Sequence, residues 1–566
     1  MTKPTEEKKN GISKALAVVK GIMAHGIPGK PRFRYVFGSG LFFALILQVA
    51  TGIAMAFYYV PSARDAYGSV FYIQNEVTFG WLIRGIHHYG ASLMIVLAVL
   101  HLAQVFIAGA YREPRQGNWL TGVGLLGLLF AFGLTGYLLP WDQTGFWATR
   151  VATSIAGGVP FVGELSQKFL VGGSAYGTAT LTRFYALHVF ALPLALMALL
   201  APHLMLFVNH GVTAPPRDIK SGRSEPFWPV QAFYDLVFMV VIVLILMTLV
   251  IVVGAPLGAP ADPVGTFDAR PEWYFLFLFQ LLKYFEGPLV LIGTVFLPGG
   301  VLAFLIVLPW LDRSEGLSFA ARWKVMVPMT VIFFGVVGLT VEARLSDSED
   351  LEYQSHVLSQ EKERQFAHAY AKNGFAPDGK IPELEGRRLF SSLGCKGCHK
   401  TEDEGEVHGP TLDGFASRAW FLGQLHDPDA PERFGNTAFK GEMEPADLEP
   451  GPMGDLVEFL ASKTGLEYEP ALDQEKIKRG EEVFSDESCD ACHALEGESM
   501  GAPNLGNYAS DEFLRALFRD PAAEELYGSL NEMPSFEDLS NSQVDALIAY
   551  LRSLRTWTEV ALPTKD

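Results

Sequence analysis

The chain has 566 residues, which is long enough for several domains. Its charge is divided unevenly: residues 345–566 hold 45 Asp and Glu against 20 Lys and Arg, whereas residues 1–344 hold 17 against 24. We therefore expect the two parts to lie in different environments, and a chain with a net charge of −18 is not expected to bind nucleic acid.

Residues 1–34 are basic and contain no apolar run of the kind found in a cleavable signal peptide. We expect an amphipathic segment on the cytoplasmic side of a membrane. Seven apolar runs follow, each near the ~20 residues that cross a hydrocarbon core of ~30 Å. One such run is compatible with a soluble core helix, but seven predict an all-α, seven-span bundle. They cover approximately residues 36–59, 86–110, 119–139, 184–207, 234–254, 289–310 and 325–343.

The distribution of Lys and Arg predicts the orientation of this bundle. Basic residues gather before the first span and after the second, fourth and sixth spans, so an inside N-terminus places all of them on the cytoplasmic side. An odd number of spans then delivers residues 345–566 to the outer face of a bacterial cytoplasmic membrane. The later basic residues are Arg112, Arg115, Arg217, Lys220, Arg223, Arg313, Arg322 and Lys324.

Two pairs of histidines lie inside the predicted spans. His87 and His101 are 14 residues apart in the second span, which places them within about 40° of one helix face and about 21 Å apart. His188 and His203 are 15 residues apart in the fourth span. Four such residues can supply both axial ligands of two stacked haems. The alternative is hydrogen bonding within the bundle, but intramembrane ionisable residues are rare and usually functional.

Glycines share the spacing of these histidines. Gly38 and Gly52 in the first span, like Gly122 and Gly136 in the third, are 14 residues apart. Glycine lets a flat macrocycle approach the backbone closely, although small residues also serve ordinary helix packing. We interpret the shared period as a sign of two haems. His88 has no partner at this spacing, so we do not expect it to be a ligand.

A polar linker, residues 344–380, separates the membrane part from an internal repeat. The stretch "GRRLFSSLGCKGCHK" from Gly386 matches "GEEVFSDESCDACHA" from Gly480 at an offset of 94, and both copies end in an amphipathic helix. We predict two small α-helical domains, residues 381–465 and 474–557.

All four cysteines lie in the two C-x-x-C-H motifs of this repeat, Cys395–Cys398 with His399 and Cys489–Cys492 with His493. A single motif of this kind is compatible with half of a zinc site or with a redox dithiol. Two motifs, each followed by a methionine, predict two covalently bound c haems with the histidine as proximal ligand.

The stretch "EMPSFEDLSNSQ" resembles the Met-Pro loop of class I cytochromes c, which implies that Met533 is the distal ligand of the second motif. A Met–His pair raises the haem potential, which suits an electron acceptor. The first copy offers Met443 and Met453. Aligning Leu448 with Leu539 places Met453 at the inward position of Val544, so Met443 is the preferred ligand. His408 and His426 are the alternatives.

Residues 1–343 resemble cytochrome b of the quinol:cytochrome c oxidoreductases, the bc1/b6f group. The stretches that carry the resemblance are "LILQVATG", "RGIHHYGAS", "GYLLPWDQTGFWATRVATSI", "TLTRFYALH" and "RPEWYFLFLFQLLKYF". It implies a four-helix haem-binding domain, residues 35–215, and a three-helix domain with a quinol site, residues 216–343. The C-terminal repeat resembles class I cytochromes c.

The resemblance assigns the b haems. It implies that His87 and His188 bind the low-potential haem near the outer face, and that His101 and His203 bind the high-potential haem near the cytoplasmic face. Arg84 and Arg183 match residues that pair with haem propionates. The 15-residue step from His188 to His203 and the seven spans are similar to cytochrome b6 joined to subunit IV. Val36 replaces the cysteine that attaches an extra haem in the b6 type.

The motif "PEWY", Pro271 to Tyr274, matches the quinol-oxidation site of the family. Glu272 is its carboxylate, and burial would raise the pKa of that group toward the range of a useful base. The alternative role is to cap the following helix. Tyr274 and Tyr137 are implied members of the site, and Trp141 belongs to its facing wall. Asp235 matches a carboxylate near the inner quinone, although an acid at a helix end looks the same.

We therefore interpret the chain as the cytochrome b–dihaem cytochrome c subunit of a quinol:cytochrome c oxidoreductase. Its cofactors would be two haems b and two haems c. The implied partners are a separate Rieske iron–sulfur protein, membrane lipid, a second copy of the complex, and a soluble or membrane-bound cytochrome c or terminal oxidase. Alternatives are a Rieske-independent quinone reductase and a non-catalytic electron conduit.

Overall fold

The computed structural model describes residues 24, 26–173, 175–214, 222–263, 265, 267–314, 316–371, 381–402, 404–497 and 502–557. The chain divides into two compact units, Met1–Gly379 and Lys380–Asp566. Nearly all regular structure in the described residues is helical, so the all-α prediction is confirmed. The predicted cytoplasmic segment before residue 24, Arg217 and Lys220, and residues 372–380 of the linker lie outside the described part.

The first unit contains seven helices that are long and apolar enough to cross a membrane, among the residues described. This confirms the predicted number of spans, and several continue beyond the apolar runs because helices extend into polar flanking residues. The spans are Phe33–Ala56, Gly80–Ile107, Gln116–Tyr137, Thr178–His210, Val230–Val252, Ile292–Leu311 and Trp323–Glu349.

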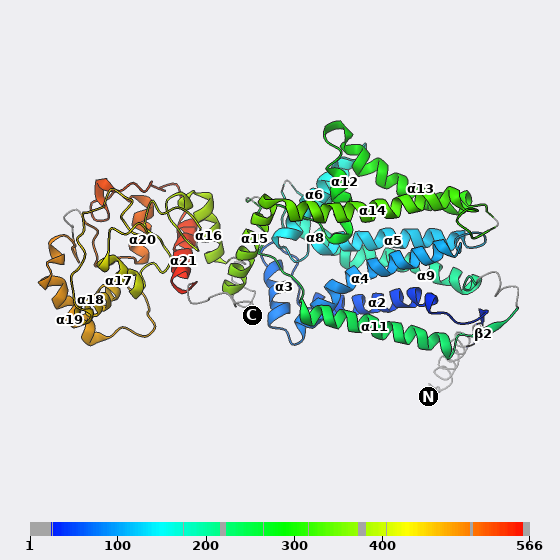
Figure 1. The fold of residues 1–566 in the computed structure, drawn as a ribbon, viewed down its shortest axis with the longest axis horizontal. Coiled ribbons are helices and arrows are strands. Elements are labelled where there is room, and N and C mark those ends of the chain that lie inside the picture. The colour runs from blue at the N-terminus through cyan, green and yellow to red at the C-terminus, as the bar shows by residue number, and fades with distance from the viewer. Residues whose placement is uncertain are drawn as a thin grey trace, which may run out of the picture. The chain divides into compact units, whose positions relative to one another are not determined.

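One half of this unit is built from the first four of these spans (Figure 1). Helix α2 (Val36–Ala56) packs against α4 (Gly80–Ile107), and α5 (Gln116–Tyr137) packs against α9 (Leu192–His210), with α4 and α5 also in contact. Helix α11 (Val230–Val252) covers α2 and α4. The glycine-bearing spans therefore lie directly against the histidine-bearing spans.

The fourth span is not a regular α-helix throughout. Helix α8 (Thr178–Ala186) passes into α9 through a π-helical turn, Leu187–Ala191, which contains His188. A π-helical turn holds one more residue than an α-helical turn. His188 and His203 are therefore 15 residues apart in sequence but keep nearly the angular relation that 14 residues give in a regular helix.

The sixth and seventh spans contain α13 (Leu297–Leu311) and α14 (Trp323–Glu349). Shorter helices connect and cover the spans: α3 (Ala66–Asn75), α6 (Gln143–Gly157), α7 (Gly163–Val171), α12 (Leu276–Leu282) and α15 (Leu351–Tyr370). Two short antiparallel strands, β1 (Gly26–Pro28) and β2 (Ser224–Pro226), tie the chain before the first span to the chain before α11.

A buried carboxylate joins two loops of this unit. The Asp312 side chain accepts hydrogen bonds from Arg112 Nη2 at 2.8 Å and from Arg322 Nε at 3.0 Å, and Tyr111 donates its hydroxyl to the same oxygen. Arg322 is 2% exposed. Two of the arginines that favour an inside location are therefore paired, and the pairing fixes the α4–α5 loop to the loop before α14.

Among the described residues of the second unit, each repeat forms three α-helices. The first copy forms α16 (Pro382–Ser392), α17 (Arg418–His426) and α18 (Pro450–Lys463), and the second forms α19 (Gln474–Asp486), α20 (Asp511–Arg519) and α21 (Asn541–Trp557). Their packing crosses between the copies: α16 lies against α21, and α18 lies against α19 (Figure 1).

Both helix crossings are close enough to require glycine. A Cβ atom on Gly386 would lie 1.9 Å from the carbonyl oxygen of Ala546, and one on Gly480 would lie 2.1 Å from that of Asp455. Backbone atoms cannot move aside as a flexible side chain can. The matched glycines of the repeat therefore serve the packing of a helix from one copy on a helix from the other.

Candidate functional site

The four intramembrane histidines form two pairs across the helix bundle. The rings of His87 on α4 and His188 in the π-helical turn have centroids 6.3 Å apart. His101 and His203 interact electrostatically with each other farther along the same helices. The first separation is about that of two imidazoles on opposite sides of one metal ion, since each metal–nitrogen bond is roughly 2 Å long. The pair therefore fits the two axial positions of a haem iron.

Each of the four period-matched glycines faces a different histidine. A Cβ on Gly136 would lie 2.7 Å from His188 Cε1, and the corresponding distances are 3.2 Å from Gly52 to His87, 3.3 Å from Gly122 to His203 and 3.6 Å from Gly38 to His101. The glycines thus leave room at the imidazoles, on the helices that flank them. This arrangement fits a flat macrocycle held between the two helix pairs.

Threonines next to three of these glycines contact the same histidines. The Nδ1 atom of His87 lies 3.0 Å from Thr51 Oγ1, that of His203 lies 3.0 Å from Thr121 Oγ1, and that of His188 lies 3.1 Å from Thr135 Oγ1. Partners of this kind orient a ligating imidazole. These contacts were not predicted from the sequence, although the Thr-Gly dipeptide recurs at all three positions. Phe37 precedes Gly38, so His101 lacks this contact.

The two arginines expected to pair with propionates differ in their surroundings. Arg84 is buried and donates from Nη1 to the carbonyl oxygen of Ala255 at 3.0 Å and from Nη2 to that of Pro256 at 2.5 Å. Arg183 is half-buried and donates to the carbonyl oxygen of Ala179, one turn earlier on its own helix. Arg84 therefore ties α4 to the chain after α11, whereas Arg183 keeps a local contact.

The three residues expected at the quinol site lie in one cluster. Glu272 interacts electrostatically with both Tyr137 and Tyr274. Tyr274 is buried in the turn before α12, and its hydroxyl oxygen would lie 2.9 Å from a Cβ on Gly133 of α5. The "PEWY" segment is therefore seated against the third span, near the end that carries Tyr137.

Burial raises the pKa of Glu272, and the nearby carboxylate of Asp142 raises it further, while the Trp273 N–H and Arg344 oppose the shift. Asp142 itself is a structural residue that the sequence analysis did not single out. Its side chain accepts hydrogen bonds from Gly145 N at 2.9 Å and Gly258 N at 3.0 Å, and so caps α6. An Asp immediately before a helix is the sequence signal that would have identified this cap.

At the opposite end of the spans, Asp235 is buried in α11 and accepts a hydrogen bond from Gln231 Nε2 at 3.1 Å. Gln231 in turn accepts the Arg32 N–H at 3.0 Å. Asp235 is therefore connected to the chain before the first span rather than exposed at a helix end.

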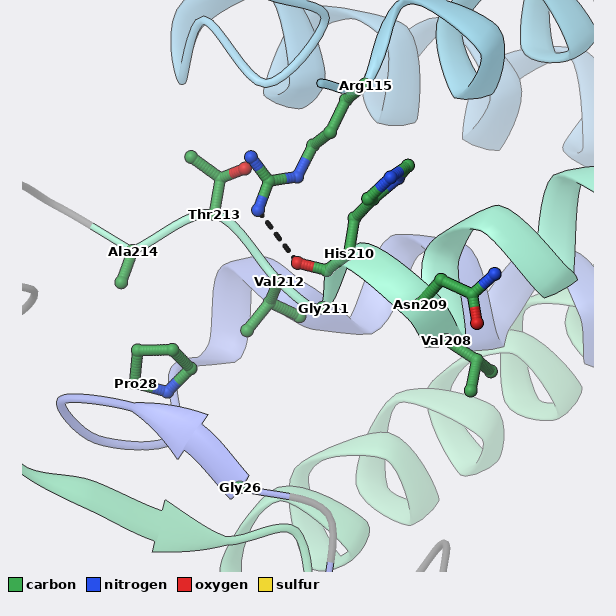
Figure 2. A pocket seen from close by; sticks show the side chains of 10 residues that line it. All are labelled: Gly26, Pro28, Arg115, Val208, Asn209, His210, Gly211, Val212, Thr213 and Ala214. Carbon is green, nitrogen blue, oxygen red and sulfur yellow. Dashed lines mark hydrogen bonds between the residues drawn. The ribbon is translucent and has the colours of Figure 1, made fainter. Parts of the chain in front are cut away.

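An open cavity of about 360 Å³ is formed by the end of α9 and the chain before α5 (Figure 2). Arg115 Nη2 donates to the His210 carbonyl oxygen at 2.9 Å across it. Three other polar atoms there are buried without a hydrogen-bond partner: Arg115 Nε, His210 Nδ1 and Thr213 Oγ1. Arg115 entered the sequence-based prediction only through the membrane topology, and His210, which lies seven residues beyond His203, was not predicted.

The two C-x-x-C-H motifs have the same local structure. The residues Cys395–Gly397 and Cys489–Ala491 each form a 3-10 turn, and no disulfide joins any of the four cysteines. His399 Nδ1 lies 2.8 Å from the Pro410 carbonyl oxygen, and His493 Nδ1 lies 3.0 Å from that of Pro503. When Nδ1–H donates to a carbonyl, Nε2 is left as the metal-binding atom, so both motifs fit covalently attached haem.

Met443 and Met533 occupy matching positions in the two copies. Three residues after Met443, the N–H of Ala446 donates to the carbonyl oxygen of Leu425. Three residues after Met533, the N–H of Phe536 donates to the carbonyl oxygen of Phe518. Leu425 and Phe518 are each the eighth residue of their helix, α17 and α20. Met453, by contrast, is buried on α18, and His408 contacts Glu532.

Comparisons with known families cover most of the chain. Residues 23–211 match the family model "Cytochrome b/b6/petB", residues 260–359 match "Cytochrome b(C-terminal)/b6/petD", and residues 384–464 and 477–555 match "Cytochrome c". The chain is 42% identical to cytochrome b6 of Porphyra purpurea and 41% identical to that of Euglena gracilis. Each match extends over 199 residues, 35% of this chain and 93% of the relative.

Among solved structures, a chain of "Hyperthermophilic respiratory Complex III" is similar, with a TM-score of 0.53 and 25% sequence identity. The similarity covers 64% of this chain and 100% of that chain.

Proposed function

Because the chain belongs to the cytochrome b/b6 family, we propose that it divides the electrons of quinol between two routes. With its two cytochrome c modules, it is a multi-pass membrane subunit for electron transfer, of the quinol:cytochrome c oxidoreductase type. One route leads to a separate Rieske iron–sulfur protein and on to the c modules. The other crosses the membrane through the two histidine pairs to an inner quinone.

The observation that carries this proposal is that both histidine pairs lie between the same two spans, Gly80–Ile107 and Thr178–His210. Both members of each pair come from different spans, and three of the four imidazoles are oriented by threonine. Bound haems would supply one-electron transfer at each end of the spans. The proposed content is two non-covalent haems b and two covalent haems c in each chain.

At the outer site, Glu272 is proposed to accept a proton from quinol. Its raised pKa makes it a better acceptor near neutral pH than an exposed carboxylate, and Tyr274 beside it is buried. Asp142 has its two oxygens occupied by backbone N–H groups, so we assign it to holding the site in place.

At the inner end, Asp235 and the cavity of Arg115 and His210 are the proposed surroundings of the quinone that is reduced. A quinone carbonyl needs N–H donors, and Arg115 Nε and His210 Nδ1 are buried there without other partners. Uptake of protons inside and release outside would translocate protons. We propose that the chain lies in a bacterial cytoplasmic membrane with its N-terminus in the cytoplasm and its c modules outside.

The test is the activity of the purified native complex. Quinol should reduce a c-type acceptor, and removal of the Rieske protein should stop both that reaction and the oxidant-induced reduction of the b haems. A complex that reduces quinone from reduced c modules without any Rieske protein would instead be the reverse quinone reductase. Electron transfer through the c haems without quinol oxidation would indicate a conduit.

A further inference from the structure

The second unit is divided into two lobes, and neither lobe is made from a single repeat. One lobe contains α16, the "CKGCH" turn and α21; the other contains α19, the "CDACH" turn and α18. The first repeat therefore contributes its haem-attachment motif to one lobe and its last helix to the other. The second repeat does the reverse.

The helix that precedes each methionine packs against the last helix of the same repeat. Helix α17 packs against α18, and α20 packs against α21. The chain between them is held to the first of these helices, because Ala446 donates to Leu425 and Phe536 donates to Phe518. Met443 thus lies between α17 and α18, in the lobe of "CDACH", and Met533 lies between α20 and α21, in the lobe of "CKGCH".

A side-chain contact independently places the Met533 segment beside the first motif. Glu532, the residue before Met533, accepts a hydrogen bond from His408 Nε2 at 3.2 Å. His408 is next to Gly409, whose Cβ would lie 2.9 Å from the Cε1 atom of His399. The methionine loop of the second repeat therefore reaches the loop that surrounds the proximal histidine of the first.

Each repeat also touches its own proximal loop, but before its methionine. Thr411 N donates to Glu432 O at 2.8 Å, and Asn504 N donates to Glu525 O at 3.1 Å. Close to these contacts in the sequence, equivalent residues of the two repeats pack on each other: Phe415 contacts Tyr508 and Phe434 contacts Tyr527, with ring centroids 6.3 and 6.1 Å apart. These ring pairs lie where the two lobes meet. After Phe434 and Tyr527, each repeat continues into the lobe that contains the haem-attachment motif of the other repeat.

We propose that the two c haems exchange their distal ligands between the repeats. Met533 binds the iron of the haem attached at Cys395, Cys398 and His399, and Met443 binds the iron of the haem attached at Cys489, Cys492 and His493. The inference rests on the proposed c haems and adds which methionine serves which haem. Each c haem is then bound by both repeats.

The test removes one c haem at a time from the complete complex and then changes one methionine. Cys489→Ala with Cys492→Ala leaves only the first c haem. In this background Met533→His should abolish the sulfur-to-iron charge-transfer band of the ferric protein and lower the midpoint potential, whereas Met443→His should change neither. Histidine keeps the iron six-coordinate, which preserves the packing of the lobe.

The background Cys395→Ala with Cys398→Ala should give the opposite result, with Met443→His abolishing the band and Met533→His leaving it. Met453→Leu is the matched control, since Met453 is buried on α18, and the band should persist in both backgrounds. Any other pattern overturns the exchange. Loss of the band on changing the methionine of the same repeat would show that each repeat ligates its own haem.

A second measurement keeps all four haems. A protease site inserted between Pro470 and Asp473 separates the repeats by one cut. After cleavage in native membranes, residues 474–566 should stay bound, because α19 and α21 are held by α18 and α16. Release of this fragment as a cytochrome with its own charge-transfer band overturns the proposal. Absence of covalent haem from the uncut, unsubstituted chain would instead contradict the proposed function.

Discussion

The hydroxyl oxygen of Thr135 lies 3.1 Å from Nδ1 of His188. The same hydroxyl has one hydrogen, which it donates to the carbonyl oxygen of Ala131, one turn earlier, at 2.8 Å. It can therefore only accept a hydrogen bond from the imidazole, so Nδ1 carries the proton and Nε2 keeps its lone pair. Thr51 makes the same pair of contacts with Leu47 and His87.

Thr135→Val should weaken the binding of one b haem, because the imidazole loses the acceptor that fixes its protonation and orientation. Loss of such a partner typically costs about 10–100-fold in metal affinity. The measurement is the b-haem content after extended detergent washing, with the midpoint potential of the retained haem. Thr248→Val is the matched control, since Thr248 makes the same helix-turn bond but is exposed on α11. Equal retention in the two variants would assign Thr135 to the helix alone.

His203→Leu should remove one b haem and leave the haem of His87 and His188 in place, since the two pairs share no ligand. A pyridine haemochrome assay should change from equal amounts of haem b and haem c to half as much b as c. Retention of both b haems, or loss of both, would contradict the assignment of independent pairs.

Glu272→Gln should slow quinol oxidation by about 10²–10⁴-fold while all haems remain bound, which is the usual contribution of a general base. Burial raises the pKa of Glu272, so the fraction of the active, deprotonated form increases as the pH rises through that raised value. The native rate should therefore rise with pH, and the variant should lose this dependence. Glu286→Gln, at an exposed acid after α12, is the control. A native-like pH profile in Glu272→Gln would make Glu272 a structural residue.

Asp312→Asn should destabilise the membrane unit by about 3–5 kcal/mol, because it leaves the buried Arg322 and the half-buried Arg112 without their carboxylate. Burial raises the pKa of Asp312, but hydrogen bonds from Ser314, Tyr111 and Arg112 outweigh it and bring the pKa to about 2. A lowered pKa of this kind stabilises the folded state above the unfolded value of about 3.9. This stability is lost as the pH falls toward 2.

Thermal unfolding in detergent, followed by circular dichroism, measures this effect at neutral and at acidic pH. The difference between the native chain and Asp312→Asn should narrow on acidification. Glu164→Gln, in an exposed ion pair with Lys168, should leave the unfolding temperature within error of the native value. A similar decrease of the unfolding temperature in Asp312→Asn and Glu164→Gln would show that the Asp312 network has no special stabilising effect.

Reduction of a basic acceptor should slow as the ionic strength rises from about 10 to 200 mM, because the Debye length falls from ~30 Å to under 10 Å. Residues 345–566 carry an excess of acidic side chains, and such a surface can raise the association rate of a basic acceptor by roughly 10–10³-fold. An acidic acceptor is the matched control and should respond in the opposite direction. A salt-independent rate would show that the acidic surface serves solvation only.

The sequence predicted the elements that repeat with a helical or tandem period. The spacing of His87 and His101, together with the glycines, was sufficient to place two pairs of imidazoles between four helices. It did not predict the π-helical turn at His188, because hydrophobic periodicity over a whole span does not resolve one extra residue. The contacts of the threonines with the histidines were not predicted, because a Thr hydroxyl in an apolar helix usually hydrogen-bonds only to a backbone carbonyl of the same helix.

The exchange of helices in the second unit was not predictable from the repeat. Gly386 on α16 and Gly480 on α19 are equivalent residues of the two copies, and so are the residues they lie against, Tyr550 on α21 and Phe459 on α18. From the sequence alone, α16 and α19 are therefore each compatible with either α18 or α21. The chain between α18 and α19 is short, and this proximity along the sequence favours their packing on each other. The domain limits 381–465 and 474–557 remain a description of the sequence repeat rather than of the lobes.

The crossing of Gly386 on Ala546 also sets an order of events during synthesis. Helix α16 belongs to the first stretch of the second unit to leave the ribosome, and α21 is the last helix among the residues that the structure describes. The lobe around "CKGCH" therefore cannot close until nearly the whole polypeptide has been made, while the lobe around "CDACH" closes earlier from neighbouring segments. An enzyme that attached haem would have the longest access to the first motif, and a premature stop near the end would damage the first lobe rather than the second.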